Sequence, residues 1–228
     1  MTDIKLSCQV RPMAFTSFGG TLPLDDNDTL YYHMANDGTD LDRYHQLRIL
    51  SAVWSAWEYH LWPFRFIHTE DINKADHLTF WAKDDIITFR DGRQVESDFK
   101  FLKNPGVLAV QFSAPSGSMI LNDNYDYSLD AKGPNSFDLE KVMKHELGHY
   151  MGLGHSKAPS EIMGASYDEN ATLTEDSIIG VQTRQAKRLQ IAATNNPAAK
   201  RFTKHFVMGV IDKPKRKRSC LQRLGLKR

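Results

Sequence analysis

The chain has 228 residues, of which 41% are hydrophobic and 25% charged, and it contains 12 Phe, 8 Tyr and 4 Trp. This composition supplies a hydrophobic core and excludes global disorder. No apolar run approaches the roughly 20 residues of a membrane-spanning helix, two cysteines exclude a disulfide framework, and no fixed sequence period indicates repeats. The net charge of +1 is unevenly divided: residues 213–228 carry eight basic and no acidic residues, whereas residues 1–212 carry 21 basic and 28 acidic residues.

The N-terminal part of the chain predicts an arm, a strand and a helix. Residues 1–28 are rich in Gly, Pro, Asp and Thr, which predicts an N-terminal extension or a wrapping arm. Residues 30–34 are a strand candidate, and Asp40 or Asp42 is placed to cap a long helix that Pro63 ends. An apolar stripe at spacings of three and four supports this helix. The stripe consists of Leu47, Leu50, Trp54, Trp57 and Leu61.

Further strands are predicted in the middle of the chain. Short runs rich in apolar and aromatic residues occur at residues 64–67, 77–82, 107–112 and 118–121. Between the second and third of these runs, residues 83–104 are polar, which predicts a long loop or a loose hairpin.

Two more helices are predicted in the C-terminal half. Ser136 is placed to cap the first of them, whose apolar residues recur at helical spacing as far as Met151. The second begins near Thr174, where Glu175 and Asp176 favour the positive end of the helix dipole. Because strands come early and helices flank them, the predicted fold class is α+β.

A histidine-rich motif carries the chemistry of the sequence. The string HELGHYMGLGH begins at His145 and ends at His155. On a helix, His145 and His149 leave the same face one turn apart, and Glu146 lies about 100° around the axis, within reach of a water on a metal. Gly152 suits a left-handed helix end, which turns the chain back so that His155 supplies a third nitrogen.

Three neutral nitrogen ligands leave one tetrahedral position open, which is typical of a catalytic zinc site. A bare H-E-x-x-H occurs by chance, and a lone helical histidine is more often a surface or core residue. The longer string fixes five demanding positions, so the zinc site is favoured over the chance occurrence.

The motif and its surroundings resemble the metzincin zinc endopeptidases, and among them the matrixins. His155 is followed by Ser156, as in matrixins, where other metzincins place an acidic residue. Residues 161–167 are similar to the Met-turn of the family, with Met163 beneath the zinc and Tyr167 four residues later.

Three further segments resemble matrixin sequence. Residues 173–182, LTEDSIIGVQ, are similar to the start of the last matrixin helix. Residues 75–80 resemble a family strand, and residues 106–109 resemble the edge strand that flanks the substrate. The resemblance implies a zincin-like fold, with a twisted mixed sheet, an antiparallel edge strand, an active-site helix and a C-terminal helix.

The resemblance implies hydrolysis of a polypeptide substrate. Zinc held by His145, His149 and His155 activates a water, and Glu146 acts as general base and proton donor to the leaving amine. The peptide is expected to extend the sheet edge along residues 106–111. The expected substrate-binding residues are Leu108, Ala109, Lys141 and Tyr167.

The sequence departs from animal matrixins at the second, structural zinc site. The edge-strand ligand position is Val110, and the later histidine position falls within residues 118–122, which contain no histidine. We therefore expect one zinc ion per chain. Calcium binding by the aspartates of residues 83–104 is a weaker expectation than a solvated polar loop. These aspartates are Asp84, Asp85, Asp91 and Asp98.

We expect an N-terminal extension at residues 1–28, a protease domain at 29–195 and a basic tail at 196–228. The resemblance implies an extracellular protein, although the first residues lack the layout of a secretory signal. Cys8 is near the place of the matrixin latency cysteine, but its surroundings favour a plain thiol. The basic residues of 213–228 favour a solvated tail over binding to nucleic acid or an acidic surface.

Two other functions compete with proteolysis. A catalytically silent, zinc-stabilised binding protein is supported by Met143 and Lys144, because the family usually has small residues there. A zinc hydrolase of non-peptide amides shares H-E-x-x-H, but Gly152 and the Met-turn oppose it.

Overall fold

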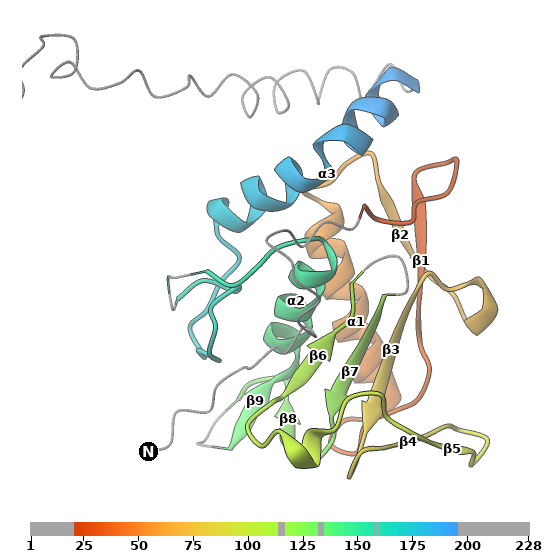
Figure 1. Ribbon diagram of the computed structural model, residues 1–228, viewed down its shortest axis with the longest axis vertical. Helices are drawn as coiled ribbons and strands as arrows, with labels where there is room; N and C mark the ends of the chain where they lie inside the picture. The colour runs from red at the N-terminus through yellow and green to blue at the C-terminus, as the bar shows by residue number, and fades with distance from the viewer. Residues whose placement is uncertain (1–20, 114–116, 132–134, 157, 159, 196–228) are drawn as a thin grey trace, which may run out of the picture.

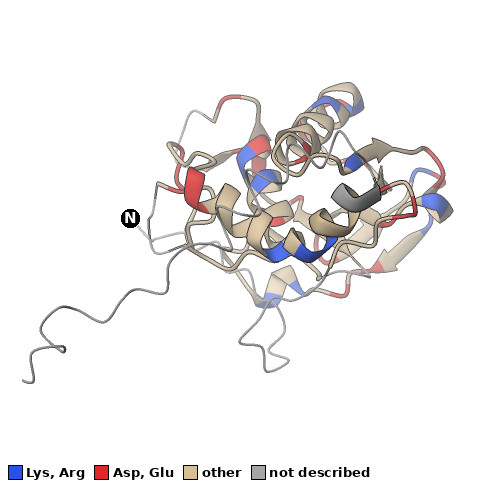
Figure 2. Cartoon of the chain, turned by 90° about the horizontal axis from the view of Figure 1, so that it is seen from above, with Lys and Arg blue, Asp and Glu red and all other residues tan. Residues whose placement is uncertain are grey.

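The computed structural model describes residues 21–113, 117–131, 135–156, 158 and 160–195 (Figure 1). The expectations for Cys8 and for the basic tail fall outside these residues. In the part of the chain that the structure describes, no helix is long and apolar enough to cross a membrane. Acidic and basic residues are interspersed along the described chain (Figure 2).

A five-stranded sheet forms the centre of the fold. Its strands are β1 (Thr29–Met34), β2 (Arg65–His68), β3 (His77–Ala82), β6 (Ala109–Gln111) and β7 (Ser118–Asn122), arranged in the order β2-β1-β3-β7-β6. The first four strands in this order run parallel, and β6 pairs with β7 in the antiparallel direction at one edge. The mixed sheet with an antiparallel edge strand confirms the predicted α+β class.

Three helices accompany the sheet: α1 (Arg43–Glu58), α2 (Leu139–Tyr150) and α3 (Glu175–Asn195). α1 and α2 contact each other and pack on one side of the sheet, and α3 lies beyond their ends (Figure 1). Asp42 caps α1, as predicted, because its carboxylate accepts a hydrogen bond from the amide of His45 at 2.9 Å. The helix ends at Glu58, before Pro63 is reached.

The cap of α2 corrects one sequence prediction. Asp138, not Ser136, is the N-cap, since its carboxylate accepts from the amide of Lys141 at 3.2 Å. Residues Ser136–Asp138 instead form β9, which pairs in parallel with β8 (Asp126–Ser128). The Ser136 hydroxyl faces that of Ser128 at 3.1 Å, so it is engaged across the two strands and does not cap the helix.

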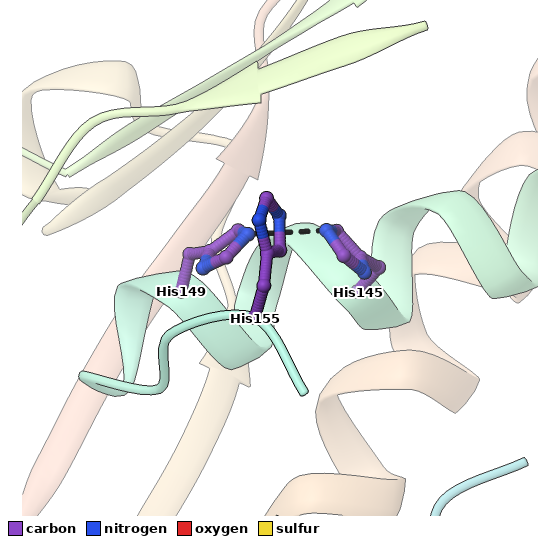
Figure 3. A group of neighbouring side chains, drawn as sticks. All are labelled: His145, His149 and His155. Atoms are coloured by element: carbon purple, nitrogen blue, oxygen red, sulfur yellow. Dashed lines mark hydrogen bonds between the residues drawn. The ribbon is translucent and has the colours of Figure 1, made fainter. Parts of the chain in front are cut away.

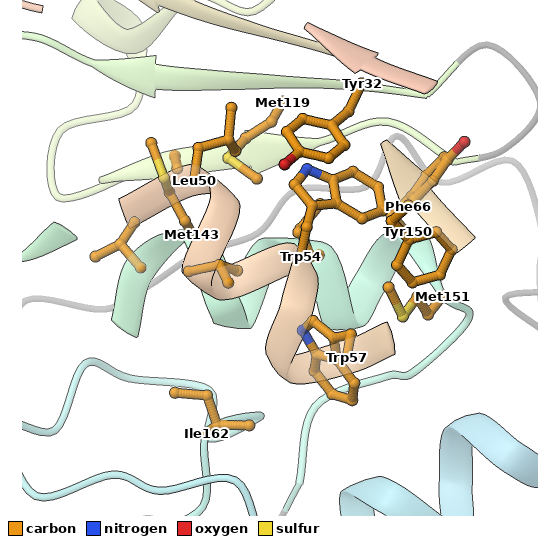
Figure 4. Close-up of a cluster of buried hydrophobic side chains, with 14 of the residues drawn as sticks. Tyr32, Leu50, Trp54, Trp57, Phe66, Met119, Met143, Tyr150, Met151 and Ile162 are labelled. Atoms are coloured by element: carbon orange, nitrogen blue, oxygen red, sulfur yellow. The ribbon is translucent and has the colours of Figure 1, made fainter. Parts of the chain in front are cut away.

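The main hydrophobic core lies between the sheet and the two packed helices (Figure 4). Trp54 of α1 stacks on Tyr32 of β1 with ring centroids 5.0 Å apart, and the Trp57 indole donates to the Lys144 carbonyl of α2 at 3.2 Å. Both tryptophans are fully buried. Leu22 is also buried in this core, which ties the start of the described chain to the domain.

The polar segment 83–104 forms a hairpin, the second of the two predicted alternatives. β4 (Ile86–Thr88) and β5 (Gln94–Glu96) pair in the antiparallel direction, and a short 3₁₀ turn, η2 (Phe101–Lys103), follows. A second 3₁₀ turn, η1 (Ile72–Lys74), lies between β2 and β3. Ile87 and Phe101 belong to a separate small apolar cluster, which anchors the hairpin to the outer part of the sheet.

Candidate zinc site

Helix α2 and the turn after it bring the three predicted zinc ligands together. His145 and His149 project from one side of α2, and His155 approaches from the following loop (Figure 3). Gly152 has a φ of 94°, which confirms the left-handed turn that reverses the chain after the helix. The potential ligand atoms of the three histidines all lie within 4.8 Å of one another.

The hydrogen bonds of His145 and His149 fix which nitrogen of each ring faces the site. Nδ1 of His145 lies 2.7 Å from the Ile162 carbonyl, and Nδ1 of His149 lies 2.8 Å from the Leu153 carbonyl. Because a carbonyl only accepts, each Nδ1 carries the proton and each Nε2 keeps its lone pair.

The two Nε2 atoms lie 3.1 Å apart (Figure 3). When both rings are neutral and protonated on Nδ1, each Nε2 atom is a hydrogen-bond acceptor. The two Nε2 atoms therefore repel each other at this distance. A cation between them converts this repulsion into attraction, and a tetrahedral zinc ion holds its nitrogen ligands roughly 3.3 Å apart. The donor set and its spacing therefore fit zinc.

The environment of the ligands favours the neutral form that binds metal. Burial lowers the pKa of His145 to about 4. Burial, and then the neighbouring His145, lower the pKa of His149 well below its usual value, and burial lowers that of His155. His155 is also the exposed member of the three, so the site opens to solvent on its side.

Glu146 is the predicted general base. It lies on α2, between His145 and His149 in the sequence, and its side chain is fully buried. Glu146 is not a member of the three-histidine group of potential ligands.

Comparison with known proteins agrees with this geometry. The matrixin family profile matches residues 24–184. Matrilysin of Rattus norvegicus is 28% identical over 191 residues, which cover 81% of this chain and 67% of matrilysin. Metalloendoproteinase 5-MMP of Arabidopsis thaliana is 31% identical over 147 residues, 59% of this chain and 38% of that protein. Karilysin of Tannerella forsythia is 28% identical over 148 residues, 61% of this chain and 28% of karilysin.

The chain belongs to the matrixin family, and its similarity to matrilysin and to a plant metalloendoproteinase agrees with this. It spans about two thirds of the length of matrilysin and less than half of the two other relatives.

Met163, the predicted Met-turn residue, lies against α2 in this matrixin domain. Its backbone carbonyl accepts from the Ser156 amide at 2.6 Å, which joins the Met-turn to the residue after His155. A Cβ atom at Gly148 would lie 2.3 Å from the Met163 sulfur. The helix therefore needs glycine at this position, between His145 and His149, to accept the buried methionine. Nothing in the sequence around Gly148 indicates this requirement.

Glu161 is a second residue of the site region that the sequence analysis missed. Its buried carboxylate accepts hydrogen bonds from the hydroxyls of Thr174 and Ser177, each at 2.6 Å, and the Ser156 hydroxyl is a further partner. Burial alone would raise the pKa of Glu161, but the hydrogen bonds outweigh it and the pKa is lowered. The network ties the loop after His155 to the start of α3.

The expected substrate-binding residues lie at two places around α2. Leu108 and Ala109 are buried, and the Leu108 carbonyl, just before β6, accepts from the Tyr127 hydroxyl at 2.7 Å. Lys141 lies at the N-terminal end of α2, where its ammonium donates to the Glu169 carbonyl. The Tyr167 hydroxyl accepts from the Asp138 amide at 3.0 Å, which places its ring beside the same helix end.

The aspartates of the hairpin segment form no group of three ligating side chains within the described part of the chain. Asp85 instead supports the hairpin, since its carboxylate accepts from the Leu102 amide at 3.1 Å.

Proposed function

We propose that this chain is a zinc-dependent endopeptidase in which Glu146 is the general base. The observation that carries the proposal is the pair of Nε2 lone pairs, from His145 and His149, held 3.1 Å apart by backbone carbonyls behind the rings. This arrangement is preorganised for a cation, and exposed His155 leaves it accessible to a substrate.

A zinc ion bound by the three histidines supplies a Lewis acid that polarises the scissile carbonyl and lowers the pKa of water. Glu146 takes a proton from the attacking water and delivers it to the leaving amine. Its burial keeps bulk water away, which strengthens the electrostatic effect of the carboxylate on the reacting groups. Met163 forms the packing floor beneath the ligand helix.

The substrate is proposed to lie extended along β6. This strand has β7 on one side, and it ends the order of the five-stranded sheet. Its outer edge is therefore available for a peptide that adds a strand, with backbone hydrogen bonds that tolerate many sequences. Ala109 contributes backbone groups at this edge. The Leu108 carbonyl already accepts from the Tyr127 hydroxyl and the Asn122 amide, so Leu108 supports the edge from the inner side. Lys141 and Tyr167 border the pocket for the residue after the cut.

The test is a protease assay on a denatured protein mixture. We expect the wild type to cleave it, a chelator to stop cleavage, and Glu146→Ala to lose nearly all activity while it keeps its zinc. Because Ala removes the carboxylate and not a ligand, retained zinc separates loss of the base from loss of the metal.

Lys144→Ala is the matched control on the same helix. The Lys144 ammonium pairs with Glu140 at 2.6 Å and is not a member of the ligand cluster, so this variant should retain activity. A zinc-loaded wild type that cleaves nothing would favour the zinc-stabilised binding protein instead.

A further inference from the structure

A second cluster of potential ligands lies where strands β1 and β2 end. His33, His68 and Glu70 each offer one ligand atom, and these atoms all lie within 4.8 Å of one another. The parallel register places Tyr32 opposite His68, so His33 is one residue beyond the paired position. None of the three residues belongs to the catalytic motif, and none occupies the positions of the structural zinc site considered above.

His33 is held in the same way as the catalytic ligands. Its side chain is buried, and its Nδ1 lies 2.8 Å from the Thr69 carbonyl. The carbonyl accepts, so Nδ1 carries the proton and Nε2 keeps a lone pair for another partner. His145 and His149 use this same arrangement to present Nε2 to zinc.

His68 and Glu70 complete the cluster from the end of β2. The His68 ring lies 6.2 Å from the His33 ring, centroid to centroid, with an angle of 19° between their planes. Its Nδ1 is 3.9 Å from Oε1 of Glu70. Burial lowers the pKa of His68, and this effect outweighs the opposing one of Glu70.

Arg43 orients Glu70 and does not saturate it. Its guanidinium lies 3.3 Å from Oε2 of Glu70, which leaves Oε1 on the side of His68. The same guanidinium pairs with Asp37 at 2.8 Å, and this carboxylate offsets part of the positive charge beside the cluster. An arginine that holds one carboxylate oxygen while the other binds an ion is a common outer partner of a metal ligand.

We propose that His33, His68 and Glu70 form a second divalent-cation site, for zinc, separate from the catalytic one. Two imidazoles and one carboxylate are a donor set that zinc accepts, with water completing the tetrahedron. A zinc ion needs ligands roughly 3.3 Å apart, closer than the present limit of 4.8 Å. Binding of the ion therefore requires the three side chains to move closer together. The ion would join the ends of β1 and β2.

Zinc stoichiometry tests the proposal directly. The full chain carrying Glu146→Ala, which should not digest itself, is dialysed against zinc chloride and its zinc per chain is measured by elemental analysis. We expect two ions, in place of the single ion predicted from sequence. Glu70→Gln or His68→Gln in this background should leave one tightly held ion and weaken the second by roughly tenfold or more.

Glu96→Gln is the matched control. Glu96 is an exposed glutamate that pairs with Lys100 at 2.5 Å, and its side chain is 71% exposed against 67% for Glu70. This variant should keep both ions. Because Glu70 is exposed, Glu70→Gln is expected to fold, and a circular dichroism spectrum checks this.

A thermal unfolding series gives a second readout. An ion that binds only the folded chain raises the unfolding midpoint as its concentration rises. In the His149→Ala background, zinc should still raise the midpoint, and adding Glu70→Gln should remove that increase. One ion in Glu146→Ala, or two ions that survive both Glu70→Gln and His68→Gln, would overturn the proposal. Neither outcome depends on whether the chain cleaves peptides.

Discussion

The two histidine clusters present nitrogen in the same way but differ in how the third ligand is held. In both, a backbone carbonyl holds Nδ1 of a buried histidine and turns Nε2 toward a neighbour. The catalytic cluster takes its third ligand, His155, from a loop that the Met-turn and Glu161 hold. The strand-end cluster takes Glu70, an exposed side chain oriented by Arg43.

This difference predicts different affinities. A preorganised site spends little binding free energy on ordering its ligands, whereas a site completed by an exposed side chain must order that side chain further when the ion binds. We therefore expect the three-histidine site to bind zinc more tightly than the cluster of His33, His68 and Glu70. Substitutions in the two clusters should therefore have different effects on zinc binding and on peptide cleavage.

The largest expected effect comes from His149→Ala. Loss of one of three ligands should abolish peptide cleavage and release the catalytic zinc, because two imidazoles no longer enclose the ion. Glu70→Gln should leave cleavage at the wild-type level, since Glu70 lies outside the proposed catalytic machinery. The ratio kcat/KM on a fluorogenic peptide measures both. Equal losses in the two variants would mean that the clusters act as one site.

The contrast between the clusters also explains what sequence could predict. The catalytic ligands fall within eleven residues on a helix and its turn, so spacing alone places them together. His33 and His68 are 35 positions apart, and only the register of two parallel strands brings them side by side. The sequence of one strand does not indicate which strand pairs with it, so the proximity of these two histidines could not be predicted from sequence.

The same reason accounts for the missed features of the fold. β8 and β9 are three-residue strands, and their pairing depends on contacts that short runs do not encode. Asp138 and Ser136 are both good helix caps, and the choice between them depends on the tertiary contact of Ser136 with Ser128. The requirement for Gly148 becomes visible only with Met163 in place.

Gly148→Ala tests whether rigidity distinguishes the catalytic cluster. The new Cβ would lie 2.3 Å from the Met163 sulfur and 3.3 Å from a Trp57 ring carbon, so the buried methionine must move. We expect a loss of about 1–3 kcal/mol in the free energy of unfolding, measured with urea. Zinc affinity at the three-histidine site should fall too, with no change at the strand-end cluster.

Met163→Ala supplies the control for this substitution. It removes the obstructing side chain at the cost of a cavity, so the double variant should be more stable than the sum of the single effects predicts. Additive effects would show that the methionine does not limit the space at position 148.

His77 shows how burial alone affects the pH dependence of stability, because it is a buried histidine outside both ligand clusters. It is fully buried, with Nε2 3.1 Å from Oε1 of Gln111, and burial lowers its pKa to about 4. As the pH falls below about 6.5, His77 becomes protonated in the unfolded chain but stays neutral in the folded chain. Stability should therefore fall by about 2 kcal/mol between pH 7.5 and pH 5.

His77→Gln should remove this part of the pH dependence, because glutamine does not titrate. The measurement is urea unfolding of both zinc-loaded proteins at the two pH values. An equal decrease in the wild type and the variant would assign the acid sensitivity to the metal ligands instead.

The smallest expected effect concerns specificity at the catalytic cluster, and it depends on Lys141. This residue lies one helical turn before His145, and its ammonium reaches the Glu169 carbonyl and lies 3.9 Å from the Asp138 carboxylate. The Lys141 side chain is only 27% exposed, and these partners offset the hydration that its ammonium loses on burial. We expect the lysine to shorten the pocket for the residue after the cut, favouring Leu, Ile or Met over large aromatic residues.

Lys141→Ala should widen the pocket, so that cleavage before bulky aromatic residues increases relative to cleavage before Leu. A peptide library varied at that position measures the ratio. Lys144→Ala is the control, because Lys144 lies on the same helix and pairs with Glu140. The same preference in the wild type and both variants would show that Lys141 only joins α2 to the loop of Glu169. In that case Tyr167, whose hydroxyl accepts from the Asp138 amide at this helix end, would be the next residue to test.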